Sequence, residues 1–272
     1  MNTSDFTGAI LVGLPHAGKS SYLALLYLAI LKKKRCSIQL ASSKDDREHV
    51  NTLMQALLKC EEASRTEVAQ TKGLRLSVRD GEGLEWTLDI PDLSGETWLD
   101  ALEVGAIDQD LFDEVQRAGA VVVFVHIGDF ATDPLISAVN AGADALGADI
   151  LPEDPESGPL GPSQVDIAQL LQAVDEIAED GCALSIVLSA FDLAGSMTPR
   201  EWLSNNAPLL DQYITANRTR RPIRLFGLSA QGGNFVTEKN SLSQIDGLER
   251  ASILDEEGAS VDVDAPILGR RG

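Results

Sequence analysis

The feature that most constrains this chain is the segment 13–20, whose sequence GLPHAGKS matches the phosphate-binding pattern GxxxxGK[ST] without a mismatch. An apolar run at residues 9–12 precedes the segment and predicts a buried strand. Helix-forming residues follow it at 20–34. Because a loop between a strand and a helix is the context that this pattern requires, we predict that the segment binds phosphate groups.

The residue types of this loop have chemical reasons. Gly13 and Gly18 let the backbone bend so that its N–H groups point at phosphate oxygens, and the helix adds its positive amino end. We expect Lys19 to reach the β- and γ-phosphates of a nucleoside triphosphate and the Ser20 hydroxyl to bind Mg²⁺. His16 is expected to be a tolerated loop residue and not a chemical group. The other predicted nucleotide-binding residues of the segment are Leu14, Pro15, His16, Ala17 and Ser21.

Buried strands alternate with helices along the rest of the chain. Residues 74–78 and 86–90 flank a turn and predict a β-hairpin. Three continuous apolar runs predict strands that are covered on both faces. They lie at 120–125, 183–188 and 223–228, and helices are predicted at 45–63, 165–179 and 199–216. This alternation predicts an α/β fold with a mostly parallel sheet, one antiparallel hairpin strand and helices on both sides.

The composition narrows the choice of partners and compartment. The net charge of -20 repels nucleic acid and anionic lipid, so neither is an expected partner. Three cysteines without metal-type spacing indicate reduced thiols and a cytoplasmic location. No signal peptide is visible at the start of the sequence. The longest apolar stretch, at 23–31, is shorter than the roughly 20 residues that span a bilayer, so no membrane span is expected.

A second candidate for metal binding follows the hairpin. The sequence LDIPDLSG at 88–95 is an apolar strand that ends in Asp92 and then Gly95. In a fold built on a phosphate loop, the neighbouring strand ends at the metal, so Asp92 is predicted to hold Mg²⁺ through a water molecule. The Gly95 N–H is predicted to bind the γ-phosphate and to move away after hydrolysis. An ordinary Asp-x-x-Gly turn is the alternative explanation.

The order of phosphate loop, hairpin and Asp92-x-x-Gly95 resembles that of the translation-factor-related (TRAFAC, Ras-like) P-loop GTPases, over about residues 10–230. The resemblance implies the three-layer α/β fold of P-loop NTPases. Within this class, the sequence GKSSYLALLY at 18–27 and the long insertion before the hairpin are most similar to the bacterial double-GTPase families. Those families are of the kind predicted in conflict or defence gene clusters.

The resemblance also implies a switch threonine and a catalytic residue. A threonine hydroxyl should join Mg²⁺ in the triphosphate state, and Thr66 is favoured over Thr71 for this role. Arg65 is more simply explained as an exposed residue than as an arginine finger. Glu96 occupies the position where the family often has a glutamine that orients water. Slow hydrolysis that needs a protein partner or a dimer is therefore expected.

Two further segments resemble the guanine-binding loops of these GTPases. Ser189-Ala190-Phe191-Asp192 follows a predicted strand and is similar to the family pattern Asn/Thr-Lys-x-Asp. Ser229-Ala230-Gln231 follows the last predicted strand and is similar to Ser-Ala-Lys. Both lysines are absent, with Ala190 and Gln231 in their places. The two partial matches favour guanine and leave ATP open.

The expected domain organisation is a P-loop GTPase domain at 1–232, with insertions at about 36–72 and 141–163. An acidic C-terminal extension at 233–272 follows, and its order is left open. The expected function is that of a Mg²⁺-dependent molecular switch that binds GTP or GDP and hydrolyses GTP. A P-loop ATPase and a catalytically weak nucleotide-binding scaffold subunit are the alternatives.

Overall fold

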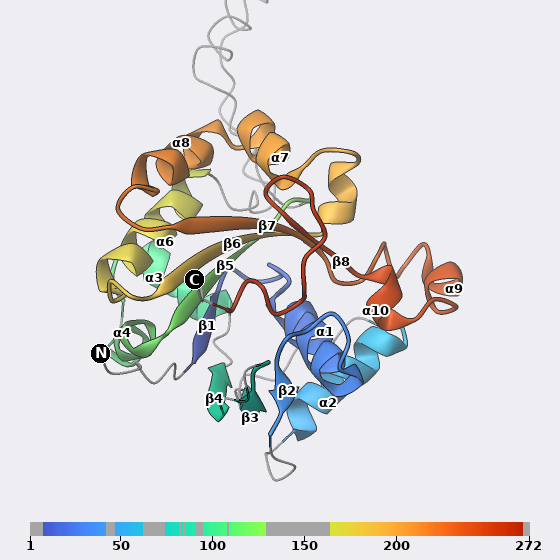
Figure 1. Ribbon diagram of the computed structural model, residues 1–272. Coiled ribbons are helices and arrows are strands. Elements are labelled where there is room, and N and C mark those ends of the chain that lie inside the picture. Colours follow the sequence, from blue (N-terminus) through green and yellow to red (C-terminus); the bar gives the residue numbers. More distant parts are fainter. Residues whose placement is uncertain are drawn as a thin grey trace, which may run out of the picture.

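The computed structural model describes residues 8–41, 47–61, 74–81, 83, 85–90, 95–107, 109–128 and 164–268. Strands and helices alternate along the chain, as the sequence pattern predicts (Figure 1). The strands are β1 (Ala9–Val12), β2 (Gln39–Leu40), β3 (Leu74–Arg79), β4 (Glu85–Ile90), β5 (Ala120–His126), β6 (Ala183–Ser189), β7 (Ile223–Ser229) and β8 (Ser252–Asp255). The helices are α1 (Lys19–Lys32), α2 (Glu48–Leu58), α3 (Gly95–Val104), α4 (Gln109–Arg117), α6 (Gln164–Ile177), the 3₁₀ helix η1 (Phe191–Ala194), α7 (Pro199–Asn206), α8 (Pro208–Asn217), α9 (Lys239–Leu242) and α10 (Gly247–Arg250).

The central sheet has five strands in the order β1-β5-β6-β7-β8. The first four are parallel, and β8 pairs with β7 in the antiparallel direction. This arrangement confirms the predicted α/β fold with a mostly parallel sheet. Because parallel strands end at the same edge of a sheet, the loops after β1, β5, β6 and β7 meet there.

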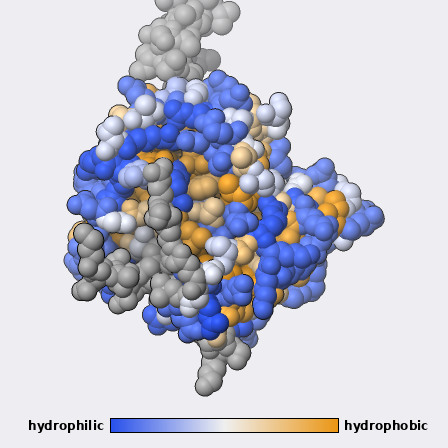
Figure 2. Space-filling model, viewed as in Figure 1, coloured by the Kyte–Doolittle hydropathy of each residue, from blue (hydrophilic) through white to orange (hydrophobic). Residues whose placement is uncertain are grey.

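Alternate residues of the strands pack into two cores, one on each face of the sheet. In β5, Val122 and Phe124 belong to one core, whereas Val121, Val123 and Val125 belong to the other. The first core includes α1 and α2, and the second includes α3, α4, α6, α7 and α8. In the face of the molecule that Figure 2 shows, apolar residues reach the surface mainly in the middle, and the outer parts are mostly hydrophilic.

The predicted hairpin is confirmed, and it belongs to a second, smaller sheet. β3 pairs with β4 in the antiparallel direction, from Leu74 opposite Ile90 to Arg79 opposite Glu85. β2 adds to β3, so the small sheet has the order β2-β3-β4. β4 lies beside β1. The small sheet therefore lies next to the β1 edge of the central sheet.

The prediction of one helix over 199–216 is wrong, because two helices, α7 and α8, occupy this range. Ala207 separates them with φ of -135° and ψ of 58°, and Pro208 begins α8. Proline has no N–H to donate and disfavours helical geometry at the preceding residue, which explains the break. The helix predicted at 45–63 is the shorter α2, and the insertion predicted at 141–163 lies outside the described residues.

Residues 233–268 of the C-terminal segment pack onto the rest of the fold. β8 extends the central sheet, and Asp264 beyond it has a fully buried side chain. One oxygen of this carboxylate, Oδ2, accepts hydrogen bonds from the Ser37 N–H at 2.8 Å, the Ser37 hydroxyl at 2.6 Å and the Ile38 N–H at 3.1 Å. These bonds join the end of the chain to the segment between α1 and β2.

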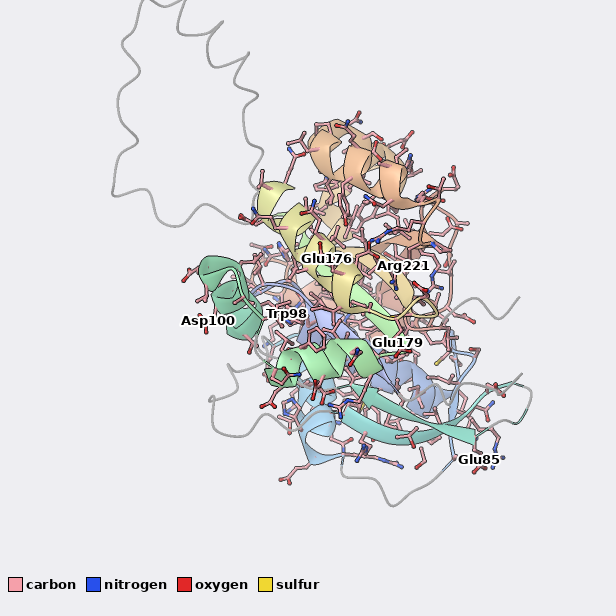
Figure 3. The ribbon with its side chains drawn as sticks, turned by 90° about the vertical axis from the view of Figure 1, so that its left-hand side faces the viewer. Glu85, Trp98, Asp100, Glu176, Glu179 and Arg221 are labelled. Carbon is pink, nitrogen blue, oxygen red and sulfur yellow. The ribbon has the colours of Figure 1, made fainter. Side chains whose placement is uncertain are left out.

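A buried ion pair closes the C-terminal end of α6. Arg221 donates to the carbonyl oxygens of Ala178 at 2.8 Å and Glu179 at 2.9 Å, and its Nε lies 2.7 Å from Oδ1 of Asp175. Figure 3 shows Arg221 and Glu179 near the end of this helix. Arg221 and Asp175 are only 7% and 6% exposed. A cation that binds the last carbonyl groups of a helix also complements the helix dipole.

We expect Asp175→Ala to lower the free energy of unfolding by about 3 kcal/mol, because the Arg221 guanidinium would stay buried without its carboxylate partner. Urea unfolding at neutral pH measures this change. Arg79→Ala is the control, since Arg79 and its partner Glu85 have side chains that are 51% and 58% exposed. The control should change stability by about 1 kcal/mol or less. Equally small changes in both variants would contradict the importance of the buried pair.

Candidate functional site

The predicted phosphate loop lies between β1 and α1, at the carboxyl edge of the sheet. Gly13 packs against β5, since a Cβ atom at this position would lie 3.0 Å from the carbonyl oxygen of Phe124. Gly18 has a φ of 93°, and a Cβ atom there would lie 3.0 Å from the Cβ of Ser189. Close packing therefore favours glycine at both positions, and the left-handed backbone favours it further at Gly18.

The loop and the amino end of α1 provide positive charge at one place. Lys19 Nζ donates to the carbonyl oxygens of Gly13 at 2.5 Å and Leu14 at 3.1 Å, which holds the ammonium group against the loop. Gly18, the N-cap of α1, provides no side-chain cap, and the first turn contains no acidic residue. The partial positive charge of this helix end is therefore not neutralised by an acidic residue of the first turn. Such an arrangement is suited to bind phosphate groups.

Ser189 ties the phosphate loop to the end of β6. Its hydroxyl donates to the carbonyl oxygen of Ala17 at 2.8 Å, and the residue is only 3% exposed. β5 lies between β1 and β6 in the sheet. The bond therefore joins the loop after β1 to the end of β6, past the end of β5. The phosphate loop is thereby held close to the chain that follows β6.

Asp192 and Ser229 come together from two different strands. Asp192 lies in η1, directly after β6, and Ser229 is the last residue of β7. The Ser229 hydroxyl donates to Oδ1 of Asp192 at 2.5 Å and accepts a hydrogen bond from the Gly232 N–H at 3.1 Å. Ser229 is buried and Asp192 is exposed. The serine therefore orients a carboxylate that is accessible to the N–H donors of a ligand.

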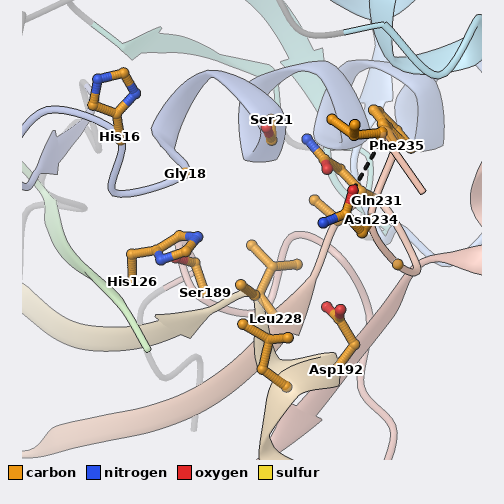
Figure 4. Close-up of a pocket in the computed structure, with 15 residues that line it drawn as sticks. His16, Gly18, Ser21, His126, Ser189, Asp192, Leu228, Gln231, Asn234 and Phe235 are labelled. Carbon is orange, nitrogen blue, oxygen red and sulfur yellow. Dashed lines mark hydrogen bonds between the residues drawn. The ribbon is translucent and has the colours of Figure 1, made fainter. Parts of the chain in front are cut away.

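A cavity of about 290 Å³ lies between the phosphate loop and this carboxylate. Figure 4 shows His16 and His126 at one end of the cavity and Asp192 and Asn234 at the other. Its lining residues are His16, Gly18, Ser21, His126, Ser189, Ala190, Asp192, Leu193, Leu228, Ala230, Gln231, Gly233, Asn234, Phe235 and Val236. The cavity thus brings together predicted residues from the phosphate loop, the end of β6 and the end of β7.

The predicted magnesium ligands are only partly described. Ser20 lies in the first turn of α1 with an exposed side chain. Thr66 and Asp92 lie outside the described residues, as does the side chain of Glu96. Gly95 begins α3. Within the described part of the chain, no group of three or more His, Cys, Asp or Glu side chains is arranged to hold a metal ion.

Helix α3, which starts at Gly95, is anchored by Trp98. The indole is fully buried and belongs to the core that also contains Val12 and Leu14, at the start of the phosphate loop. Figure 3 shows the Trp98 ring on the inner side of α3. The predicted switch glycine therefore stands at the beginning of a helix that shares a core with the phosphate loop.

Sequence reasoning missed two parts of the cavity lining, His126 and the loop at 233–236. His126 is the last residue of β5 and pairs with Ser189 of β6 in the sheet register. A signal for this residue was present, because neighbouring parallel strands end at a common edge. The loop at 233–236 carries no such signal, since a contact with a residue far along the chain holds it in place.

That residue is Arg250 of α10, which is 9% exposed. Its guanidinium carbon lies 5.3 Å from the centre of the Phe235 ring, and Nη1 donates to the Leu242 carbonyl at 3.0 Å. Nη2 donates to the carbonyl oxygen of Leu57 in α2. One buried guanidinium therefore supports the loop beside the cavity and connects it to α2.

Two of the described cysteines, Cys36 and Cys182, are not suited to be catalytic nucleophiles. Burial raises the pKa of the Cys182 thiol to about 11 and also raises the pKa of Cys36, so both stay protonated at neutral pH.

Among the helices that the structure describes, none is long and apolar enough to cross a bilayer. The cavity beside the phosphate loop is therefore the strongest candidate for a functional site in the described residues.

Comparison with protein families matches residues 10–268 to Double-GTPase 1. No curated protein matches the chain. Among solved structures, the chain is similar to Roco2 RocCORdC of Methanosarcina barkeri bound to GDP, with 11% identity, a TM-score of 0.40, and coverage of 91% of this chain and 52% of that chain. It is also similar to the mammalian SRP receptor, with 14% identity, a TM-score of 0.37, and coverage of 87% and 98%. A signal recognition particle receptor complex of Chaetomium thermophilum gives 13% identity, a TM-score of 0.37, and coverage of 88% and 96%.

The family match extends from β1, through the phosphate loop and the cavity, to the segment beyond β8. The predicted resemblance to double-GTPases is thereby confirmed over nearly the whole chain. The chain belongs to the Double-GTPase 1 family and is a GTP-binding P-loop protein.

Proposed function

We propose that this protein is a Mg²⁺-dependent molecular switch that binds GTP and GDP and hydrolyses GTP slowly. The observation that carries the proposal is the single cavity that has the phosphate loop at one end and the Asp192–Ser229 pair at the other. A nucleotide needs both ends, since its phosphates are anionic and a guanine base presents N–H donors. The proposed setting is the cytoplasm of a bacterium, with a protein partner or a second copy of the chain completing the site.

At the phosphate end, Lys19 and the amino end of α1 bind the β- and γ-phosphates. The ammonium group already lies against the loop through its bonds to Gly13 and Leu14, so little reorganisation is needed. Positive charge at this place stabilises the negative charge that develops when water attacks the γ-phosphate in line with the leaving oxygen. The backbone N–H of Gly95 is proposed to contact the γ-phosphate and to release it after hydrolysis.

Magnesium fits the residues at this end of the site. The Ser20 hydroxyl is exposed at the start of α1, and a hydroxyl is the hard oxygen ligand that Mg²⁺ prefers. Thr66 and Asp92 are proposed as the further ligands, the latter through a water molecule. When bound, Mg²⁺ neutralises charge on the β- and γ-phosphate oxygens.

At the base end, the Asp192 carboxylate is proposed to accept hydrogen bonds from the guanine ring N–H and the exocyclic amine. Ser229 holds one carboxylate oxygen in place, and the backbone of Gly232 holds the serine. Ala230 lines the same end of the cavity. An ionised carboxylate accepts hydrogen bonds and donates none, so it selects a base edge that carries donors.

Specific residues favour two alternatives to a GTPase. Ala190 and Gln231 lie where the resembling GTPases have lysines, and this difference favours a P-loop ATPase. Glu96 places a negative charge at the position of the usual water-orienting glutamine, which favours a nucleotide-binding scaffold with little activity. Phosphate release from GTP and ATP by the purified protein separates the scaffold from either enzyme.

The first test of base recognition is a calorimetric titration of nucleotide-stripped protein with GTP, GDP and ATP, each with Mg²⁺. We expect GTP and GDP to bind at least about tenfold more tightly than ATP, a difference of about 1.4 kcal/mol. Asp192→Asn should abolish this preference, because an amide presents a donor to the guanine N–H groups. Asp180→Asn is the matched control, since it removes the same charge from an exposed loop outside the cavity. Equal ATP binding that Asp192→Asn leaves unchanged would show that the protein is not guanine-specific.

Magnesium binding is tested with Ser20→Ala. The ratio of GTP affinity with Mg²⁺ to GTP affinity with EDTA is expected to fall by about tenfold, because the variant lacks one hard oxygen ligand. Affinities of the two proteins in EDTA serve as the internal control and should agree. A ratio that does not change would exclude the Ser20 hydroxyl as a ligand.

The role of Glu96 is tested by single-turnover hydrolysis of bound GTP. Glu96→Ala is expected to lower the rate by about tenfold or more, because a side chain that positions or deprotonates water would be lost. Glu96→Gln keeps the hydrogen-bonding shape without the charge and separates orientation from proton transfer. Rates in both variants that match the parent would remove Glu96 from the mechanism.

A further inference from the structure

Asn234 lies at the same end of the cavity as Asp192, in a loop that is tied to this carboxylate. The Ser229 hydroxyl donates to Oδ1 of Asp192 at 2.5 Å and accepts from the Gly232 N–H at 3.1 Å. Asn234 follows Gly232 by two residues. Gly232 has a left-handed φ of 78°, and a Cβ atom there would clash with the carbonyl oxygen of Arg250. The loop before Asn234 is therefore held between Ser229 and Arg250.

The Asn234 side chain has a defined orientation. Its Oδ1 accepts hydrogen bonds from the N–H groups of Val236 at 2.8 Å and Thr237 at 3.1 Å. Its own N–H donates to the Glu238 carboxylate at 2.9 Å. The amide nitrogen cannot take the place of the oxygen, because two N–H donors face that position. Nδ2 is therefore left as a donor, and within the described part of the chain it has no hydrogen-bond partner.

This donor faces the same space as the Asp192 carboxylate. Figure 4 shows the two side chains on opposite sides of one end of the cavity, far from His16, and a dashed line marks a bond that holds the Asn234 oxygen. An ionised carboxylate only accepts hydrogen bonds, whereas the remaining end of the Asn234 amide only donates them. This end of the cavity therefore offers a ligand both an acceptor and a donor.

A guanine base has the complementary groups on one edge. Its ring N–H and exocyclic amine are donors, and the carbonyl oxygen directly beside the ring N–H is an acceptor. An adenine base carries an amine, which is a donor, where guanine has this oxygen. A donor from the protein at this place therefore favours guanine and disfavours adenine.

We propose that Nδ2 of Asn234 donates a hydrogen bond to the carbonyl oxygen of a guanine base that Asp192 holds. The inference rests on the proposed function, because it takes the base and its orientation from it. The contact would select against adenine at the end of the site where Ala190 and Gln231 replace the lysines of the resembling GTPases. Because backbone N–H groups already hold the amide oxygen, little side-chain freedom is lost when the base binds.

Two variants remove the donor and keep an oxygen for the turn. Asn234→Ser and Asn234→Asp each retain a side chain that accepts hydrogen bonds from backbone N–H groups at the start of a helical turn. The midpoint of urea unfolding should therefore stay as in the wild-type protein. This measurement separates loss of a ligand contact from loss of the loop structure.

Calorimetric titration with GTP, GDP and ATP, each with Mg²⁺, tests the contact. In Asn234→Ser, the affinities for GTP and GDP are expected to fall by about threefold to tenfold, and the affinity for ATP by less than about twofold. Asn234→Asp should lower the affinity for GTP further, because a carboxylate would face the guanine oxygen. It should also raise the ratio of ATP to GTP affinity, since a carboxylate accepts from the adenine amine.

Asn240→Asp on α9 is the matched control, because it makes the same charge change at an exposed residue that does not line the cavity. It should bind all three nucleotides like the wild type. The proposal is overturned if Asn234→Ser binds GTP like the wild type. It is also overturned if the affinities for GTP and ATP fall by the same factor, since a contact with the phosphates or the sugar is common to both nucleotides.

The analogue 7-deaza-GTP, which lacks the ring nitrogen on the other side of the carbonyl group, identifies the acceptor. It should bind the wild-type protein within about twofold of GTP. A larger loss that disappears in Asn234→Ser would place the contact at the ring nitrogen and overturn its assignment to the oxygen. Wild-type protein that binds no guanine nucleotide would overturn the proposed function together with this inference, whereas normal guanine binding in the wild type and in both variants overturns this inference alone.

Discussion

The site depends on the close approach of the phosphate loop to the end of β6. Gly18 leaves no room for a side chain beside Ser189, and the Ser189 hydroxyl bonds to the carbonyl oxygen of Ala17 at 2.8 Å. A larger residue at position 18 would push the loop and the strand apart. Because Asp192 follows Ser189 by three residues, this contact also sets where the carboxylate lies relative to the phosphate loop. The parallel order β1-β5-β6 makes the approach possible, since these strands end at one edge.

The C-terminal segment supports this arrangement from outside the parallel strands. Arg250 holds Phe235 beside the cavity and bonds to the end of α2, so the Phe235 side of the cavity and α2 share one buried guanidinium. Farther along, the buried Asp264 carboxylate accepts three hydrogen bonds from Ser37 and Ile38. Removal of either side chain would leave buried polar partners unsatisfied, which is costly in the interior. The segment beyond β7 is therefore part of the scaffold of the site.

The acidic composition of the chain is compatible with a site for an anionic ligand because the positive charge is local. The repulsion of an anion by the net charge of -20 acts over long distances and is screened by salt. The attraction by Lys19 and the amino end of α1 acts at hydrogen-bonding distance, beside the phosphate loop. A buried carboxylate and the carboxylate of the cavity both have defined partners. Asp175 faces Arg221, and Asp192 accepts from the Ser229 hydroxyl. Local geometry therefore outweighs the overall charge.

The sequence by itself determined the elements whose signals are local. The phosphate loop with its flanking strand and helix, the hairpin, and the buried strands were predictable, because glycine, lysine and alternating or continuous apolar residues report on their own neighbours. The break at Pro208 carried a local signal too, although the prediction joined α7 and α8 into one helix. Only the tertiary structure decided that β8 closes the sheet, that Ser229 orients Asp192, that Arg250 holds Phe235, and that His126 faces the cavity. These relations join residues from separate strands or from distant parts of the chain, and such pairings follow from packing of the whole fold, which no local pattern encodes.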